Sequence, residues 1–167
     1  MNCISTKAAA AQARMQQLLD SLPNAEERRE AAIHTYEVAR FCAVLALKRG
    51  ENADLAEAAG WLHDCWRYAS GLSANHAAEG AALAREWLCA MPEFSPADIE
   101  AVCTAISLHS RKAQTDETLA EILKDADVLS HFIQQPQAVE VSEEAVRLRR
   151  LLTELAQAFA SPQEEQA

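Results

Sequence analysis

The sequence predicts an all-α fold, a single-domain helical bundle of about six to eight helices. Half of the 167 residues are hydrophobic, which is enough for one packed core. Glycine and proline are scarce, at four and five residues, and no stretch alternates between polar and apolar residues as a half-buried strand does. We expect one domain over residues 1–160, followed by a loose tail over 161–167.

The first part of the chain carries signals for two helices. An alanine-rich helix should end at about Leu22, because Pro23 follows and cannot continue it. A second helix should begin after Asn24, whose spacing to Glu27 fits a capping box. Its apolar residues recur at helical spacing, and the helix should end near Gly50.

Two more helices are expected before the middle of the chain. An asparagine and an aspartate near position 52 can cap a helix that reaches about residue 62. Residues 70–73, which contain glycine and two serines, form the next break. A fourth helix should run over about 75–91, because Pro92 lies just beyond it.

The second half of the chain opens with a strong helix start signal. Ser95 precedes a proline and lies three residues before Asp98, an arrangement typical of a capped helix N-terminus. This helix should end at about His109. Further helices are expected over about 116–133 and 142–160.

Composition restricts the function classes. Fifteen basic and 25 acidic residues give a formal charge of −10, so binding to nucleic acid is not expected, because such a surface repels phosphate backbones. A small phosphorylated substrate would need a local positive charge, which a metal ion could provide. The five cysteines form no CxxC pair, and no long apolar run is present. We therefore expect a cytoplasmic location and no membrane partner.

Several histidines and aspartates lie at predicted helix ends or on apolar helix faces. The candidates are His34, His63, Asp64, His76, His109, Asp125 and Asp127. Imidazole nitrogens and carboxylate oxygens suit divalent transition metals such as iron, manganese, zinc, cobalt or nickel. Each residue alone has an ordinary explanation as a helix cap or a solvated side chain, so the prediction depends on their occurring together and in order.

That order resembles the H…HD…D signature of the HD phosphohydrolase superfamily. His34, the pair His63-Asp64, and Asp127 supply it, within the segments AGWLHDCWRY and ILKDADVL. The resemblance covers about residues 30–133 and is closest to small bacterial HD nucleotide hydrolases. It implies an HD-domain-like helical fold in which these four residues bind one metal ion.

Two further histidines extend the resemblance to subfamilies that hold two metals. His76 and His109 match the extra ligands of those subfamilies, in which Asp64 would bridge the ions. The resemblance therefore implies two ions, iron or manganese by preference, with cobalt, nickel or zinc as alternatives. Helical geometry does not choose between Asp125 and Asp127, but the alanine-aspartate pair before an apolar residue favours Asp127.

Three cations are candidates for binding substrate phosphate. Arg67 lies three residues after Asp64 and could bind a phosphate as a bidentate donor. We predict that Asp64 and Arg67 both act in catalysis. Arg111 and Lys112 directly follow His109 and could contact phosphate, although a solvated loop explains them equally well. His131 lies one turn after Asp127 and is expected at the surface or behind a ligand.

The resemblance implies hydrolysis of a phosphoester or phosphoanhydride, on a small phosphorylated substrate such as a nucleotide, by metal-activated water. One alternative is a di-iron HD-type oxygenase, since the ligand set is shared. Another is a non-catalytic HD-fold signalling or binding module. The chain contains no GYP sequence, which argues against cyclic dinucleotides as substrates. The sequence leaves the oligomeric state open, a homodimer included.

Overall fold

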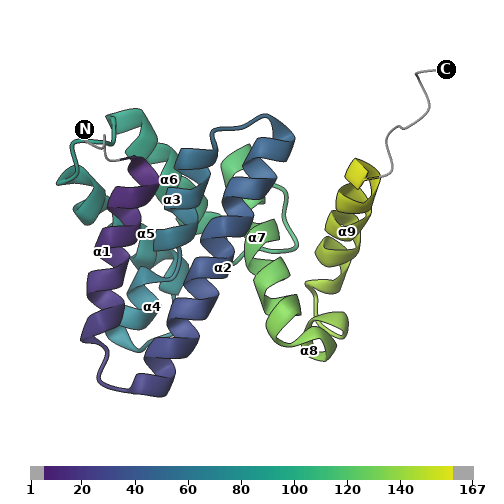
Figure 1. Ribbon diagram of the computed structural model, residues 1–167, viewed down its shortest axis with the longest axis horizontal. Coiled ribbons are helices and arrows are strands. Elements are labelled where there is room, and N and C mark those ends of the chain that lie inside the picture. The colour runs from purple at the N-terminus through teal and green to yellow at the C-terminus, as the bar shows by residue number, and fades with distance from the viewer. Residues whose placement is uncertain (1–5, 160–167) are drawn as a thin grey trace.

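The computed structural model describes residues 6–159, and these residues form a bundle of helices without a β-strand (Figure 1). The all-helical prediction is confirmed. The helices are α1 (Lys7–Ser21), α2 (Ala25–Arg49), α3 (Ala53–Leu62), α4 (Cys65–Ser70), α5 (His76–Cys89), α6 (Pro96–Leu108), α7 (Thr118–Gln134), α8 (Pro136–Glu140) and α9 (Ala145–Phe159). The predicted tail over 161–167 lies outside the described residues, and the single-domain boundary stays a prediction.

The helix ends follow the capping signals of the sequence. Asn24 Oδ1 accepts hydrogen bonds from two backbone amides of the first turn of α2, and Gly50 ends that helix in the left-handed region at φ 73°. Ser95 and Asp98 form a complete capping box at the start of α6. These polar contacts satisfy amides that the helix itself leaves unpaired.

Two short helices were not anticipated. α4 follows Asp64 directly and ends at Gly71, whose φ of 72° fits a left-handed helix terminus. α8 begins at Pro136 immediately after α7. Helices of six and five residues are too short to show an apolar period, which explains why the sequence pattern did not reveal them.

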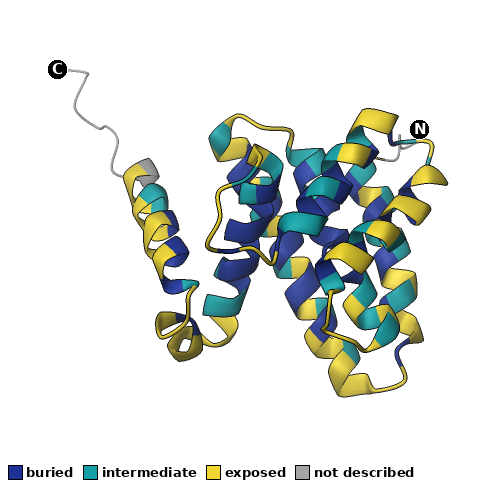
Figure 2. Cartoon of the chain, turned by 180° about the vertical axis from the view of Figure 1, so that it is seen from behind, coloured by how far each residue is buried: buried dark blue, intermediate teal, exposed yellow. Residues whose placement is uncertain are grey.

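The main core is built mostly from α1, α2, α3, α5, α6 and α7, and α4 and α9 add Cys65 and Leu151. Figure 2 shows buried residues on the inner faces of the helices. A close contact between α2 and α3 sets the position of the site. A Cβ on Gly60 would lie 2.6 Å from Ala39 Cα, so only glycine allows the two helices to pack this tightly. Three residues later, α3 ends at His63.

Besides Leu151 in the main core, two further kinds of contact attach the C-terminal helices to the bundle. α8 and α9 lie to one side, beyond α7 (Figure 1), with a small apolar cluster of Val128, Val139 and Leu148. Ion pairs also attach α9 to α7, because Arg147 and Arg150 of α9 both contact the buried carboxylate of Asp125 on α7. None of the helices in the described part of the chain is both long and apolar enough to cross a membrane.

Candidate metal centre

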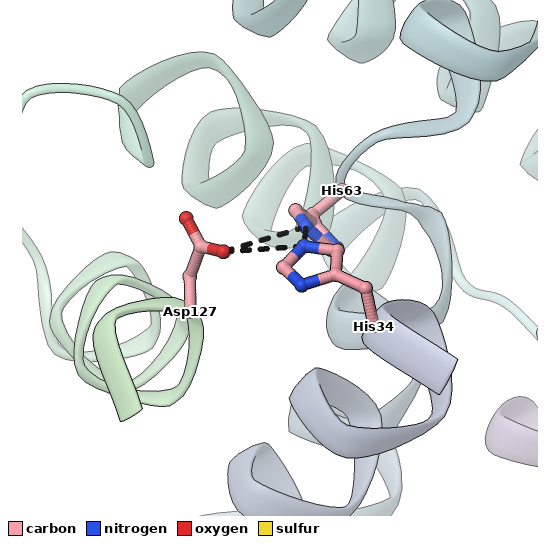
Figure 3. Close-up of side chains that lie close together, drawn as sticks. All are labelled: His34, His63 and Asp127. Carbon is pink, nitrogen blue, oxygen red and sulfur yellow. Dashed lines mark hydrogen bonds and ion pairs between the residues drawn. The ribbon is translucent and has the colours of Figure 1, made fainter. Parts of the chain in front are cut away.

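Three side chains from separate helices converge in the interior of the bundle. His34 comes from the middle of α2, His63 from the end of α3, and Asp127 from α7; Figure 3 shows them pointing toward one another. The Nε2 atoms of the two histidines lie 3.2 Å apart. Asp127 Oδ1 lies 3.4 Å from His34 Nε2 and 3.8 Å from His63 Nε2. One ligand atom of each residue lies within 4.8 Å of the others, which is compatible with one shared ion. We call these residues the first group.

A second group of three lies beside it. His76 opens α5, and His109 caps the end of α6. Their Nε2 atoms also lie 3.2 Å apart, and each is 3.7 Å from Asp64 Oδ1. Asp64, His76 and His109 could therefore hold an ion of their own.

Asp64 faces both groups. While its Oδ1 belongs to the second group, its Oδ2 lies 3.7 Å from His63 Nε2 and 3.9 Å from His34 Nε2. A carboxylate with one oxygen toward each group is suited to bridge two cations. Two His/Asp groups joined in this way are consistent with a binuclear metal site.

The hydrogen bonds of the imidazoles direct their Nε2 atoms toward the centre of each group. Each Nδ1 lies within hydrogen-bond distance of an oxygen: Ser130 Oγ for His34, and the carbonyls of Gly60, Ser73 and Ile106 for His63, His76 and His109. A carbonyl only accepts, so Nδ1 of the last three histidines carries the hydrogen, and a neutral ring then has a lone pair on Nε2. Ser130 Oγ donates to Glu37, which leaves the hydroxyl oxygen to accept from His34 Nδ1. Metal-binding histidines are oriented by partners of this kind.

The carboxylates supply a second indication of a cation site. Asp64 Oδ1 and Asp127 Oδ1 are among the buried side-chain oxygens of residues 6–159 that have no hydrogen-bond partner. Leaving such an oxygen unpaired is costly in a protein interior. Opposed nitrogen lone pairs together with orphaned carboxylate oxygens fit a divalent transition metal, whose positive charge would satisfy both.

Burial and neighbouring charges keep His63, Asp64 and Asp127 in the protonation state that binds metal. Burial lowers the pKa of His63 to about 4, so the ring is neutral at pH 7. Burial alone would raise the pKa of Asp127, but the Lys112 ammonium and nearby histidines outweigh it and hold that pKa well below its ordinary value. For Asp64 too, His63 and His109 overcome the effect of burial and lower the pKa. Both aspartates are therefore anionic.

The structure separates the two candidate aspartates of α7. Asp127 faces the histidines, whereas Asp125 is fully buried away from them and pairs with Arg49, Arg147 and Arg150. Asp127 is thus the aspartate of α7 that is placed to bind an ion. Its role as a ligand, like that of the other five candidates, stays a prediction.

The three predicted phosphate-binding cations have different surroundings. A cleft of about 630 Å³ adjoins the first group, and Arg67, whose side chain is 48% exposed, lies in its wall. Arg111 instead donates to Asp116, and Lys112 is buried with its ammonium against Asp127 Oδ2. Neither Arg111 nor Lys112 is among the described residues that line this cleft.

Some residues around the site were not found by the sequence analysis. Ser130 and Glu37 orient His34, and Glu144 contacts His131. Ser130 lies three residues after Asp127, so helical spacing could have indicated that the two share a face. No local sequence pattern indicates Glu144, because it lies 13 residues after His131 and follows α8 in the chain.

Comparison with known proteins gives one family and a small set of distant relatives. Residues 31–131 match the HD domain. The chain is 31% identical to Ribonuclease Y of Streptococcus sanguinis strain SK36 over 98 residues, which are 58% of this chain and 17% of that protein. It is 30% identical to Ribonuclease Y of Streptococcus agalactiae serotype III over 132 residues, which are 78% and 23%. The chain thus spans 17–23% of these relatives' length. No solved structure matches it.

Proposed function

Because the chain belongs to the HD domain family, we propose that it is a metal-dependent phosphohydrolase that cleaves a phosphoester or phosphoanhydride of a small substrate such as a nucleotide. One observation carries the proposal: Asp64 lies between two pairs of imidazoles, each pair with its Nε2 atoms 3.2 Å apart. Such an arrangement offers possible ligands for two cations.

The proposed ligands are His34, His63 and Asp127 for one ion and His76 and His109 for the other, with Asp64 shared. Iron and manganese fit this mixed nitrogen and oxygen set best, with cobalt, nickel and zinc as alternatives. When bound, the ions would supply a water activated for attack on phosphorus and positive charge for the phosphoryl oxygens.

Arg67 is the residue of this chain best placed to bind the phosphoryl group. Its Nη1 donates to Asp64 Oδ2 at 3.1 Å, and Arg67 is among the residues that line the cleft. Partial burial opposes its charge, but the Asp64 carboxylate raises the pKa of Arg67 above the ordinary value. A permanently charged planar donor can hold two phosphate oxygens but cannot donate a proton at neutral pH, so Arg67 would bind and orient.

The cleft supports a small substrate over a polynucleotide. A volume of about 630 Å³ is in the range of pockets that enclose small molecules. Glu27, Glu30 and Glu144 contribute carboxylates to its lining, against a single arginine. A chain of phosphates would meet repulsion there, and the net charge of −10 adds to it. We therefore propose a substrate with few phosphates, which differs from the activity named for the ribonuclease relatives.

The test is metal analysis combined with a substrate screen. The purified protein is analysed for bound metal, stripped with chelator, and reloaded with Mn²⁺, Fe²⁺, Co²⁺ or Ni²⁺. Hydrolysis is then assayed in the absence of oxygen, with nucleoside mono-, di- and triphosphates and p-nitrophenyl phosphate as substrates. An oxygenase would be inactive under these conditions. We expect metal-dependent hydrolysis with a preference for small substrates. A protein that binds none of these ions, or binds them and hydrolyses none of the substrates, would contradict the proposal.

A further inference from the structure

The carboxylate of Asp127 is contacted by two side chains that are outside both metal groups. The ammonium of Lys112 pairs with Asp127 Oδ2. On the other oxygen, His131 Nε2 lies 3.4 Å from Oδ1, and the His131 ring stacks on His34 with an angle of 10° between the planes. Asp127 therefore has a neighbour at each oxygen: the Lys112 ammonium pairs with Oδ2, and His131 lies within ion-pair distance of Oδ1 without a hydrogen bond.

Lys112 is itself held by the C-terminal helix. Arg147 of α9 is buried, and its Nε donates to the Lys112 carbonyl at 3.0 Å. The same guanidinium donates to the Gln114 carbonyl at 3.1 Å and to Asp125 Oδ1 of α7 at 2.8 Å. Arg147 thus ties the loop that carries Lys112 to the helix that carries Asp127.

His131 is held by the same part of the chain. Both carboxylate oxygens of Glu144, the residue before α9, lie 3.2 Å from His131 Nδ1. This contact fixes the plane of the imidazole and directs its Nε2 toward Asp127. Glu144 and Arg147 are three residues apart, and each grips one of the two neighbours of Asp127.

We propose that Glu144 and Arg147 are positioning residues of the metal centre, which set the orientation of Asp127 through His131 and Lys112. Both lie beyond residues 31–131, the part of the chain that matches the HD domain. The inference rests on the metal centre proposed above and adds the start of α9 to it. Partners behind a metal ligand typically change metal affinity about tenfold to a hundredfold when they are removed.

The alternative is that these contacts only attach α9 to the bundle. Arg150 offers a matched control because it also extends from α9 to Asp125, at 3.2 Å, and to Glu121, at 3.6 Å. It has no hydrogen bond to the 112–114 carbonyls among the described contacts. Arg150→Ala should therefore weaken the attachment of α9 without disturbing Lys112.

The experiment measures Mn²⁺ binding by calorimetry and by the paramagnetic resonance signal of a coupled manganese pair. The full-length wild-type protein is compared with Glu144→Gln, Arg147→Ala and Arg150→Ala. We expect Glu144→Gln and Arg147→Ala each to weaken one of the two sites by about tenfold or more and to reduce the coupled signal. Arg150→Ala should retain wild-type binding. Thermal melts show which variants are folded at the assay temperature.

A double variant tests whether Arg147 acts through Lys112. If it does, Lys112→Met and Arg147→Ala together should weaken binding no more than the stronger single variant does. Wild-type affinity at both sites in folded Glu144→Gln and Arg147→Ala would overturn the inference, as would equal losses in Arg150→Ala. Should Arg147→Ala not fold, Glu144→Gln and Lys112→Met decide alone. If the wild-type protein binds no Mn²⁺, the same comparison is made with Fe²⁺, Co²⁺ or Ni²⁺; a wild-type protein that binds none of these ions would instead contradict the proposed function.

Discussion

The two groups of the metal centre are supported in different ways. In the first group, two ligands have side-chain partners that are distant in sequence: Ser130 lies behind His34, and Lys112 from the 109–117 loop pairs with Asp127. Its third member, His63, directs Nδ1 at the local Gly60 carbonyl. In the second group, His76 and His109 each direct Nδ1 at the carbonyl of the residue three positions earlier, Ser73 and Ile106. His34 and Asp127 are therefore supported by tertiary contacts, whereas His63, His76 and His109 are supported by the local backbone.

This difference indicates which substitutions should disturb each group. The two histidines of the second group need correct helix ends on α5 and α6, which are neighbours in sequence and pack directly against each other, and Asp64 joins them from the start of α4. The first needs α2, α3 and α7 in register, together with the loop and helix that hold Lys112 and His131. We therefore expect substitutions at distant partners such as Ser130 and Lys112 to disturb the first group more than the second.

The largest expected effect is that of His63→Ala, which breaks the first group directly. His63 Nε2 faces His34, Asp127 and the oxygen of Asp64 that points to this group. We expect the loss of one ion and a fall in turnover of about a thousandfold or more, because several kcal/mol of charge stabilisation is removed. Metal content and hydrolysis rate are the measurements. If the variant kept both ions and full activity, the site would be wrong.

The next effect concerns the stability of the metal-free protein, again through His63. The folded pKa of about 4 lies below the unfolded value of 6.5, so between these values the unfolded chain binds the extra proton. The free energy of unfolding should therefore fall as the pH is lowered from 6.5 to 4, by about 3 kcal/mol in total. Denaturant titrations in chelator at several pH values test this, and His63→Gln should show a shallower dependence.

His76→Ala removes a ligand of the second group and leaves the residues of the first group unchanged. His76 lies at the start of α5 with a quarter of its side chain exposed, and it has no contact with the first group among the described interactions. We expect one Mn²⁺ to remain bound and turnover to fall about a hundredfold, as when one stabilising partner of the transition state is removed. Loss of both ions would show that the groups do not bind separately.

Arg67→Ala should spare the metals and weaken the handling of substrate. A hydrogen bond to a charged group contributes about 1.5–3 kcal/mol, so kcat/KM should fall about tenfold to a hundredfold. Arg67→Lys keeps the charge but not the planar pair of donors and should recover only part of the loss. Two bound ions by metal analysis are the control. Unchanged kcat/KM in Arg67→Ala would remove this residue from substrate binding.

The extent to which the sequence predicts this molecule follows from the same contrast. Helix ends at Asn24, Gly50 and Ser95 were predictable because caps are local chemistry. The order of His34, His63-Asp64 and Asp127 predicted which residues meet, because the family fixes their arrangement. Helical spacing did not choose between Asp125 and Asp127, since both lie near the edge of the apolar face; the family resemblance favoured Asp127, and in the structure Asp127 is the one that faces the histidines.

Other features could not be predicted because they depend on distant contacts. Lys112 was expected to meet substrate phosphate, but its side chain turns inward to Asp127, and Arg147 from α9 holds its backbone. Glu144 reaches His131 only because α8 reverses the chain between them. Neither the loop conformation nor this reversal leaves a periodic signal in the sequence.

The smallest expected effect tests the charge of the cleft. Glu27 and Glu30 line it and are exposed, so Glu27→Gln and Glu30→Gln should each raise kcat/KM for a nucleoside triphosphate about two- to fivefold at low salt. The gain should be smaller for a monophosphate, which carries less charge, and should shrink at high salt through screening. Glu26→Gln is the matched control, since Glu26 is exposed on the same turn of α2 but does not line the cleft. Equal gains in all three variants would mean that overall charge, and not the cleft, sets the substrate preference.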